Sequence, residues 1–178
     1  MIFDIYTDGS CSGNPGPAGW GYLVICEGKI VYEKFGATTN EHEDVVYCTN
    51  QQSEMMALEK ALRLMVQRFN SGKPNPEEIK IYSDSAYLLN CFIKKWYVNW
   101  KKYANNGIWL TSQKSPVCNQ WLWNKMINQT IFLEQLGVKF TYIKVKGHSG
   151  NPHNERADQL ANLGTQLAQQ ILQPKMNI

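Results

Sequence analysis

The amino-acid sequence predicts one α/β domain built on a mixed sheet, and three observations support that fold class. Residues 2–36 contain three strand-like segments joined by turns, which is typical of an antiparallel meander. Strand-like and helix-like segments then alternate, as in sheets that have helices packed on them. The 178 residues suffice for one domain with a sizeable core but are too few for two ordinary domains.

The first 36 residues carry the strand signals. Residues 2–8 alternate between one side with Phe3 and Ile5 and another side with Asp4 and Asp8. The turn GSCSGNPGPAG separates this strand from two further strands, WGYLVICEG and KIVYEKFG, which a Glu-Gly turn joins. The pattern therefore predicts an antiparallel meander.

The rest of the chain predicts helices alternating with strands. After a polar loop, Thr49 and Gln52 match a capping box at the start of a helix that ends near residues 70–72. The apolar positions of this helix recur at helical spacing: Met55, Leu58, Leu62, Met65 and Phe69. The later predicted elements are a strand over 79–85, a helix from Ser85 to about Trp96, a helix capped by Asn119 and running to about 136, a strand over 138–147, a flexible loop over 148–154, and a helix over 155–172 that Pro174 prevents from continuing.

Charge is unevenly distributed, although the net charge is only +3. Residues 1–93 hold seven Lys or Arg against twelve Asp or Glu, whereas residues 94–146 hold nine Lys against the single acid Glu134. Five of the six tryptophans also fall in this basic segment. Lysines interleaved with large aromatic residues suit a nucleic acid, but a solvated basic face over aromatic core residues explains the composition equally well.

Composition also limits the class and compartment of the protein. A hydrophobic content of 43% and a charged content of 19% exclude a disordered chain or a fibre. The N-terminal residues show no basic leader followed by an apolar core, so we expect a cytoplasmic protein without a membrane span. Five scattered cysteines without a C-x-x-C pair favour a reducing compartment, and the three histidines are not spaced with them as zinc ligands.

Four acids lie at positions where a charge is difficult to accommodate. Asp8 and Asp84 end apolar strands, Glu54 borders the apolar stripe of its helix, and Asp158 stands between apolar residues near the start of the last helix. Burying one unpaired carboxylate costs roughly several kcal/mol, and a cluster of them requires cations. Carboxylate ligands without Cys or His favour magnesium, with manganese as a substitute, and point to phosphoryl chemistry.

Each of these acids also has a simpler explanation when it is considered alone. Asp8 precedes a glycine and could form a turn. Glu54 and Asp158 could interact with helix dipoles, and Asp84 could belong to a helix cap. Sequence spacing does not show that the four side chains meet. His148, in a glycine-flanked loop, could transfer protons or be a surface side chain without a task.

Five segments in order resemble the motif series of type 1 ribonuclease H: TDGSCSGNPGPAGWG, TNQQSEMMALEKAL, IYSDSAYL, WYVNWKK and VKGHSGNPHNERADQLA. The order, the spacing and the residue identities match from about Ile2 to Ala168. The resemblance implies a ribonuclease H-like mixed five-stranded sheet with helices on both faces. It also implies a catalytic domain over 1–168, with a basic protrusion at about 96–118 and a C-terminal tail over 169–178.

The resemblance further implies an endonuclease that hydrolyses the RNA strand of RNA/DNA hybrids, removes replication primers and R-loops, and leaves 5′-phosphate and 3′-hydroxyl ends. Two Mg²⁺ ions would serve as cofactors, with Mn²⁺ as a substitute. By motif position, Asp8 would touch both ions, Glu54 and Asp84 would lie on the leaving-group side, and Asp158 would hold the ion that activates water. His148 would assist proton transfer or product departure.

The same resemblance assigns the residues that contact the hybrid. Those along the RNA strand or near a DNA phosphate are Cys11, Ser12, Asn14, Thr49, Asn50 and Gln51. Those of the basic protrusion are Trp96, Trp100, Lys101, Lys102, Trp109 and Lys114. We expect a monomer that binds the hybrid duplex with salt-dependent affinity.

Some residues depart from the family pattern. Ala86 stands where many bacterial members have Gln, the loop before Thr49 is longer than in the compact bacterial form, and YANNGIW lengthens the protrusion. Three alternatives remain at this stage: a non-catalytic hybrid-binding module, the ribonuclease H domain of a viral reverse transcriptase, and a DNA nuclease or recombinase with the same sheet.

Overall fold

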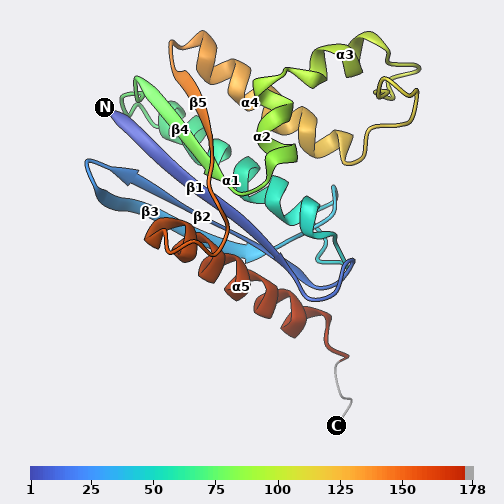
Figure 1. Cartoon of the computed structure of the whole chain (residues 1–178), viewed down its shortest axis with the longest axis horizontal. Helices are drawn as coiled ribbons and strands as arrows, with labels where there is room; N and C mark the ends of the chain where they lie inside the picture. The colour runs from blue at the N-terminus through green and yellow to red at the C-terminus, as the bar shows by residue number, and fades with distance from the viewer. Residues whose placement is uncertain (175–178) are drawn as a thin grey trace.

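The computed structural model describes residues 1–174 and contains one five-stranded sheet packed with helices, as predicted (Figure 1). The sheet order is β3-β2-β1-β4-β5. The elements in chain order are β1 (Ile2–Cys11), β2 (Ala18–Cys26), β3 (Lys29–Ala37), α1 (Asn50–Asn70), β4 (Glu78–Ser83), α2 (Ala86–Ile93), α3 (Trp96–Lys102), α4 (Gln120–Gln135), β5 (Lys139–Lys144) and α5 (Pro152–Leu172).

The sheet is mixed because a meander is followed by two parallel strands. β1, β2 and β3 pair antiparallel, whereas β4 pairs parallel with both β1 and β5. Tyr6 of β1 is in register with Tyr82 of β4. Asp8 and Asp84 each follow two residues later, so the parallel register brings these two acids to the same end of the sheet.

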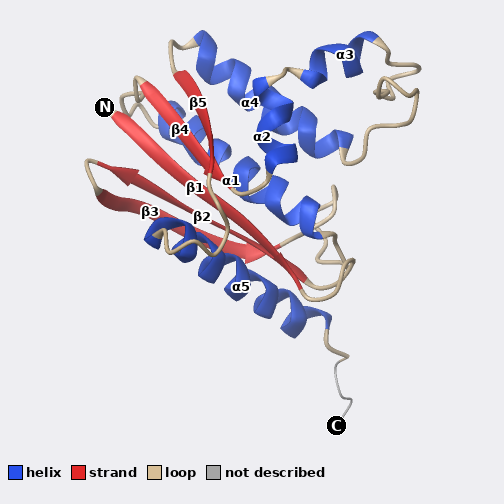
Figure 2. Ribbon diagram, in the orientation of Figure 1, coloured by secondary structure: helices blue, strands red, loops and turns tan. Residues whose placement is uncertain are grey.

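Helices cover both faces of the sheet, as predicted (Figure 2). On one face, Phe3 and Ile5 of β1 belong to a large core shared with α1, α2 and α4. On the other face, Tyr6 and Leu23 pack with Leu160 of α5 in a smaller cluster. The alternation seen in residues 2–8 therefore separates the two cores. Within residues 1–174, no helix combines the length and the apolar character that crossing a membrane requires.

The start of α1 was predicted correctly, whereas several other boundaries differ from the prediction. The strands predicted over 79–85 and 138–147 are shorter, because β4 ends at Ser83 and β5 ends at Lys144. The Thr49 hydroxyl accepts a hydrogen bond from the Gln52 backbone N–H at 3.1 Å, which is one half of the predicted capping box. The other half does not form, because the Gln52 side chain donates to the Thr39 carbonyl at 3.0 Å. Asn119 does precede α4, but it adopts φ 56° and its side chain makes no capping bond. The predicted turn over 9–19 is shorter than expected, because β1 continues to Cys11 and β2 begins at Ala18.

The predicted helix from Ser85 to Trp96 was wrong at its C-terminal end. α2 ends at Ile93, and Lys95 adopts the left-handed region with φ 50°, so that Trp96 begins a separate helix. Aromatic contacts stabilise this break, since the Trp96 ring lies 5.7 Å from the Tyr87 ring between centroids. Tertiary packing therefore overrides a continuous helical pattern here.

The predicted flexible loop over 148–154 was wrong for its last three residues. The Asn151 side chain accepts hydrogen bonds from the backbone N–H groups of His153 and Asn154 at 3.0 and 3.1 Å. Pro152 occupies the first turn, where its missing N–H costs nothing. α5 therefore starts at Pro152, and it ends at Leu172 as predicted.

Close glycine contacts let α5 lie against the sheet. The Cα of Gly164 has the backbone of Gly19 and the carbonyl of Gly36 directly beside it, where a Cβ would collide with both. Gly21 makes a similar close approach to the backbone of Ala161. These contacts fix the distance between α5 and β2, and hence the position of Asp158 on α5.

We predict that Gly164→Ala lowers the free energy of unfolding by about 2–3 kcal/mol, because the added methyl group meets backbone atoms that cannot move independently. The gain in helix propensity, about 1 kcal/mol, is smaller than this penalty. Urea denaturation measures the difference. Gln166→Ala, at an exposed position of the same helix, is the control and should change stability by less than about 0.5 kcal/mol. Equal effects of the two changes would contradict the close-packing explanation.

Candidate active site

The four predicted acids come from four different elements that converge at one end of β1. Asp8 lies on β1 and is 8% exposed, while Glu54 on α1, Asp84 after β4 and Asp158 on α5 are partly buried. Gly9 makes the approach of α1 possible, because a Cβ there would collide with the backbone at Ser53 and Glu54. The structure therefore brings together residues that lie far apart in the sequence.

Burial and neighbouring negative charge perturb the Asp8 carboxyl strongly. Its pKa rises to about 8, first because burial disfavours the carboxylate and next because Asp84 lies nearby. A hydrogen bond from the Gly9 N–H at 2.8 Å partly opposes this rise, whereas Asp158 and Glu54 add to it. The negative charges of all three other acids therefore help to raise the pKa of the Asp8 carboxyl.

Glu54 shares this environment but has hydrogen-bond donors that reduce the cost of its charge. Burial is the main cause that raises the pKa of its carboxyl, and the charge of Asp84 adds to it. Hydrogen bonds from Ser85 and from Asn50 lower this pKa, the latter running from Nδ2 to Oε1 at 3.0 Å. Ser85 and Asn50 therefore favour the ionised form that a metal ligand requires.

The cluster offers carboxylate oxygens and no histidine or cysteine as potential metal ligands. Within residues 1–174, no group of three or more His, Cys, Asp or Glu side chains has a geometry that could hold a metal ion by itself. Asn162 also donates from Nδ2 to Asp158 Oδ2 at 3.3 Å. The four acids lie close enough to influence one another electrostatically, and carboxylate oxygens are the ligands that hard divalent cations prefer.

His148 lies on the loop between β5 and α5, which passes beside Asp84. A Cβ placed on the neighbouring Gly147 would be 2.8 Å from Asp84 Oδ2. His148 itself is exposed and has φ 51°, in the left-handed region that non-glycine residues rarely adopt. The imidazole is thus accessible to solvent on a loop whose backbone contacts the acid cluster.

The residues predicted to contact the RNA strand lie near one another and are linked to the acids. Asn14, in the tip of the β1–β2 hairpin, accepts a hydrogen bond from the Asn50 backbone N–H at 3.2 Å. Asn50 in turn donates to Glu54. Cys11 Sγ lies 3.2 Å from the Cys48 carbonyl, which links the hairpin to the loop before α1. The exposed Ser12 and Thr49 lie on the same two segments.

A cavity of about 400 Å³ separates the start of α1 and α2 from the loop after α3. Gln51 and Tyr87 line one side of it, and Thr111, Ser112 and Gln113 line the other. The hydroxyl and amide side chains among its lining residues and the position of the predicted contact residue Gln51 in its wall make this cavity part of the candidate substrate surface. Tyr87 was not predicted, because one exposed tyrosine in a short helix carries no distinctive sequence signal.

The protrusion combines exposed lysines with buried tryptophans. Figure 1 shows α3 and its following loop extending from the domain beyond α2 and α4. Trp100 and Trp109 are only 7% and 8% exposed and belong to the core, so these two indoles support the surface instead of forming it. Lys101 lies over the Trp109 ring at 5.1 Å from its centroid. The remaining predicted contact residues of this segment are the partly buried Trp96 and the exposed Lys102 and Lys114.

Supporting residues around the acids were missed from the sequence. Ser10 donates to Asn162 Oδ1 at 2.6 Å, and Asn162 donates to Asp158, so one chain of hydrogen bonds links the end of β1 to α5. Asn162 follows Asp158 by four residues, which is one helical turn. That spacing was the only available signal, and Ser10 had none.

The sheet order and the placement of helices define the class of fold, which solved structures share. LC11-RNase H1 in complex with an RNA/DNA hybrid matches with a TM-score of 0.66 and 21% identity, covering 93% of this chain and 98% of that chain. A foamy viral protease-reverse transcriptase in complex with dsDNA matches with a TM-score of 0.64 and 17% identity over 92% of each chain. At these identities, the likeness shows the ribonuclease H fold alone.

Sequence comparison then identifies the family. The RNase H family model matches residues 2–166. The ribonuclease H of Syntrophomonas wolfei is 44% identical over 157 residues, covering 88% of this chain and 91% of the relative. The ribonuclease H of Rhizobium etli is 42% identical over 161 residues, covering 90% and 89%. The chain therefore belongs to the RNase H family of enzymes, as its motifs indicate.

We predict that Asp8→Asn stabilises the protein in the absence of divalent cations. Between about pH 4 and pH 8, the unfolded state has released the Asp8 proton while the folded state retains it, since the pKa rises from 3.8 to about 8 on folding. The free energy of unfolding therefore falls as pH rises through this window. The amide of the Asp8→Asn variant has no proton to release in this range, so the variant does not lose stability in this way. Its free energy of unfolding should exceed that of the wild-type protein by at least about 2 kcal/mol at pH 8 and differ little near pH 4.

Urea denaturation in EDTA at several pH values tests this expectation. Asp44→Asn, in the exposed loop before α1, removes the same charge outside the cluster and is the matched control. A pH-independent effect of Asp8→Asn, or an equal effect of the control, would show that the acids do not repel one another as the structure indicates.

Proposed function

We propose that this chain is a metal-dependent endonuclease that hydrolyses the RNA strand of RNA/DNA hybrids and leaves 5′-phosphate and 3′-hydroxyl ends. The observation that carries the proposal is the buried Asp8 carboxyl, whose pKa is raised by burial and by the negative charges of three further acids. Such a cluster is costly to fold unless cations neutralise it. Membership of the RNase H family supports the reaction, and the hybrid bound to LC11-RNase H1 supports the substrate. Removal of replication primers and R-loops in the cytoplasm would follow from this activity.

Asp8, Glu54, Asp84 and Asp158 would hold two Mg²⁺ ions, or Mn²⁺ in their place. When bound, such ions activate the attacking water and stabilise the departing oxygen. The chain contributes the arrangement of the acids. Asp8 lies deepest, at the point where the influence of the other three acids meets. The side-chain amides of Asn50 and Asn162 donate hydrogen bonds to Glu54 and to Asp158, respectively, and so orient these two carboxylates.

His148 would move protons at the edge of this site. Its side chain is exposed, and the loop that carries it contacts Asp84 through Gly147. An imidazole in this position can reach both solvent and the edge of the acid cluster. We assign it to protonation of the departing 3′-oxygen or to release of the product, and not to holding the metal.

Two surfaces would select the hybrid. The hairpin tip and the start of α1 present hydroxyl and amide groups of Ser12, Asn14, Thr49, Asn50 and Gln51, which suit the 2′-hydroxyls and phosphates of the duplex. The protrusion presents the lysines that neutralise phosphates. We place the catalytic domain at residues 1–168, which the family match over 2–166 supports. Residues 169–172 of the proposed tail continue α5, and 175–178 lie outside the described residues.

The proposed activity predicts cleavage of only one of three labelled duplexes. With Mg²⁺, the protein should cut the RNA strand of an RNA/DNA hybrid and leave double-stranded RNA and double-stranded DNA intact. Gel analysis of end-labelled strands also reports the chemistry of the new ends. Binding of the hybrid without cleavage would favour a non-catalytic module, and cutting of the DNA duplex would overturn the proposed substrate.

Asp84→Asn is the matched variant for this assay. It removes one metal-ligating charge at a position outside the hairpin and the protrusion, so it should lower the cleavage rate by at least about 100-fold while changing hybrid affinity by less than about threefold. An equal loss of binding and cleavage would contradict the role assigned to Asp84.

We predict that replacing both Lys101 and Lys102 with Ala weakens hybrid binding by about tenfold and lowers the slope of log affinity against log salt by about one per lost phosphate contact. Both lysines are exposed on α3, so folding should be unaffected. Fluorescence anisotropy at several salt concentrations measures affinity and slope together. Replacing the exposed Lys29 and Lys139 with Ala is the control, and an unchanged slope in the α3 variant would remove the protrusion from the binding surface.

A further inference from the structure

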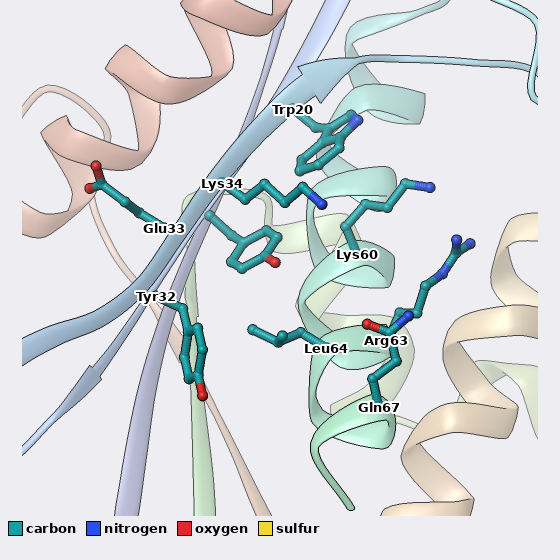
Figure 3. Close-up of a pocket in the computed structure, with 9 residues that line it drawn as sticks. Trp20, Tyr32, Glu33, Lys34, Lys60, Arg63, Leu64 and Gln67 are labelled. Carbon is teal, nitrogen blue, oxygen red and sulfur yellow. The ribbon is translucent and has the colours of Figure 1, made fainter. Parts of the chain in front are cut away.

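A second cavity lies between α1 and strands β2 and β3, and none of the candidate active-site residues line it. Its volume is about 310 Å³. Figure 3 shows Lys34 extending from β3 and Lys60 extending from α1 beside the Trp20 ring, with Arg63 one turn further along α1. Two elements that are distant in the sequence thus place three cationic side chains around one space.

The acids near this cavity offset only part of its positive charge. Glu33 is directed away from the lysines, as Figure 3 shows, and both of its oxygens accept hydrogen bonds from Arg156 of α5 at 3.0 and 2.7 Å. Glu59 is 1% exposed, forms an ion pair with Arg63 at 3.0 Å and accepts a hydrogen bond from Gln129 of α4 at 3.0 Å. Glu59 thus offsets the charge of Arg63, and the excess of positive charge at the cavity comes from Lys34 and Lys60.

The two lysines in particular lack close counter-charges. In the described part of the chain, Lys34 forms no ion pair, and the one ion pair of Lys60 is to Glu59 at a long 3.8 Å. Burial lowers the pKa of the Lys60 ammonium, and the attraction of Glu59 opposes this only in part. An ammonium group that is partly desolvated and weakly paired is stabilised by an incoming anion.

The aromatic residues of the cavity provide an apolar wall more than a stacking surface. The Trp20 and Tyr22 rings stack at 6.0 Å between centroids, but these residues are only 6% and 3% exposed, so little ring surface is available. An apolar wall behind cations strengthens their attraction for an anion. The Tyr32 hydroxyl accepts a hydrogen bond from Arg68 at 3.3 Å and is directed away from Lys34 and Lys60, as Figure 3 shows.

We propose that this cavity binds the phosphoryl group of a small anion no larger than a nucleoside monophosphate. Lys34, Lys60 and Arg63 surround the space from two sides, which suits a group with several equivalent oxygens. The volume is at the lower end of the range for small-molecule pockets, about 300–1,000 Å³, and therefore suits a small ligand. Inorganic phosphate and a nucleotide share this chemistry, and the site is independent of the proposed cleavage site.

The experiment titrates the metal-free protein with adenosine 5′-monophosphate, inorganic phosphate or neutral adenosine, and follows backbone amide signals by NMR. EDTA keeps the acid cluster free of cations, so its carboxylates repel the probes. We expect saturable shifts at Trp20, Lys34 and Lys60 with both anions and none with adenosine. Tighter binding of the nucleotide would identify a nucleotide as the ligand, and equal binding would identify the free anion; both results support a phosphoryl site.

The Lys34→Gln/Lys60→Gln double variant should weaken anion binding at least about tenfold. Lys29→Gln/Lys139→Gln removes the same charge from exposed strand positions outside the cavity and should leave the affinity unchanged. Absence of saturable shifts in the cavity of the wild-type protein would overturn the proposal. So would an equal loss of affinity in the two variants, because binding would then depend only on net charge. Circular dichroism confirms that each variant is folded.

Discussion

The mutual repulsion of the carboxylates around Asp8 is the constraint that the rest of the structure must satisfy. The pKa of that buried group rises to about 8 because burial and three other acids disfavour its charge. A fold keeps such an unfavourable group only if other contacts hold its neighbours in place. Here β1 and β4 bring Asp8 and Asp84 to one sheet end, and the absence of a side chain at Gly9 lets α1 bring Glu54 close.

The two cores provide the free energy that offsets this repulsion, and they also determine which element supplies each acid. The larger core fixes α1 against the sheet, and the smaller core, with the close contacts at Gly19 and Gly164, fixes α5. Each fully buried large apolar side chain contributes about 1.5–3 kcal/mol, so a few such residues exceed the electrostatic cost of the cluster. The stability of the domain and the position of Asp158 therefore depend on the same contacts.

Local sequence patterns predicted the fold class, the strand meander and the Thr49 cap because each depends on neighbouring residues. The four acids could be chosen from their awkward positions, but their meeting required the family resemblance, since it depends on the parallel register of β1 and β4. The break at Lys95 and the burial of Trp100 were not predicted. The break accompanies the contact of Trp96 with Tyr87, and Trp100 is buried against Trp123 of α4, some 20 residues later in the chain.

The way charges gather in three dimensions also could not be predicted from the sequence alone. The basic segment 94–146 was evident from composition, whereas Lys34 and Lys60 lie in residues 1–93, where acids outnumber bases by twelve to seven. A count along the chain therefore predicts a negative surface there. In three dimensions, Arg156 of α5 engages Glu33, and Glu59 is buried against α4. Arg156 from the second half of the chain thus pairs with Glu33, while Glu59 pairs with Arg63 of its own helix. Lys34 and Lys60 remain as a local concentration of positive charge.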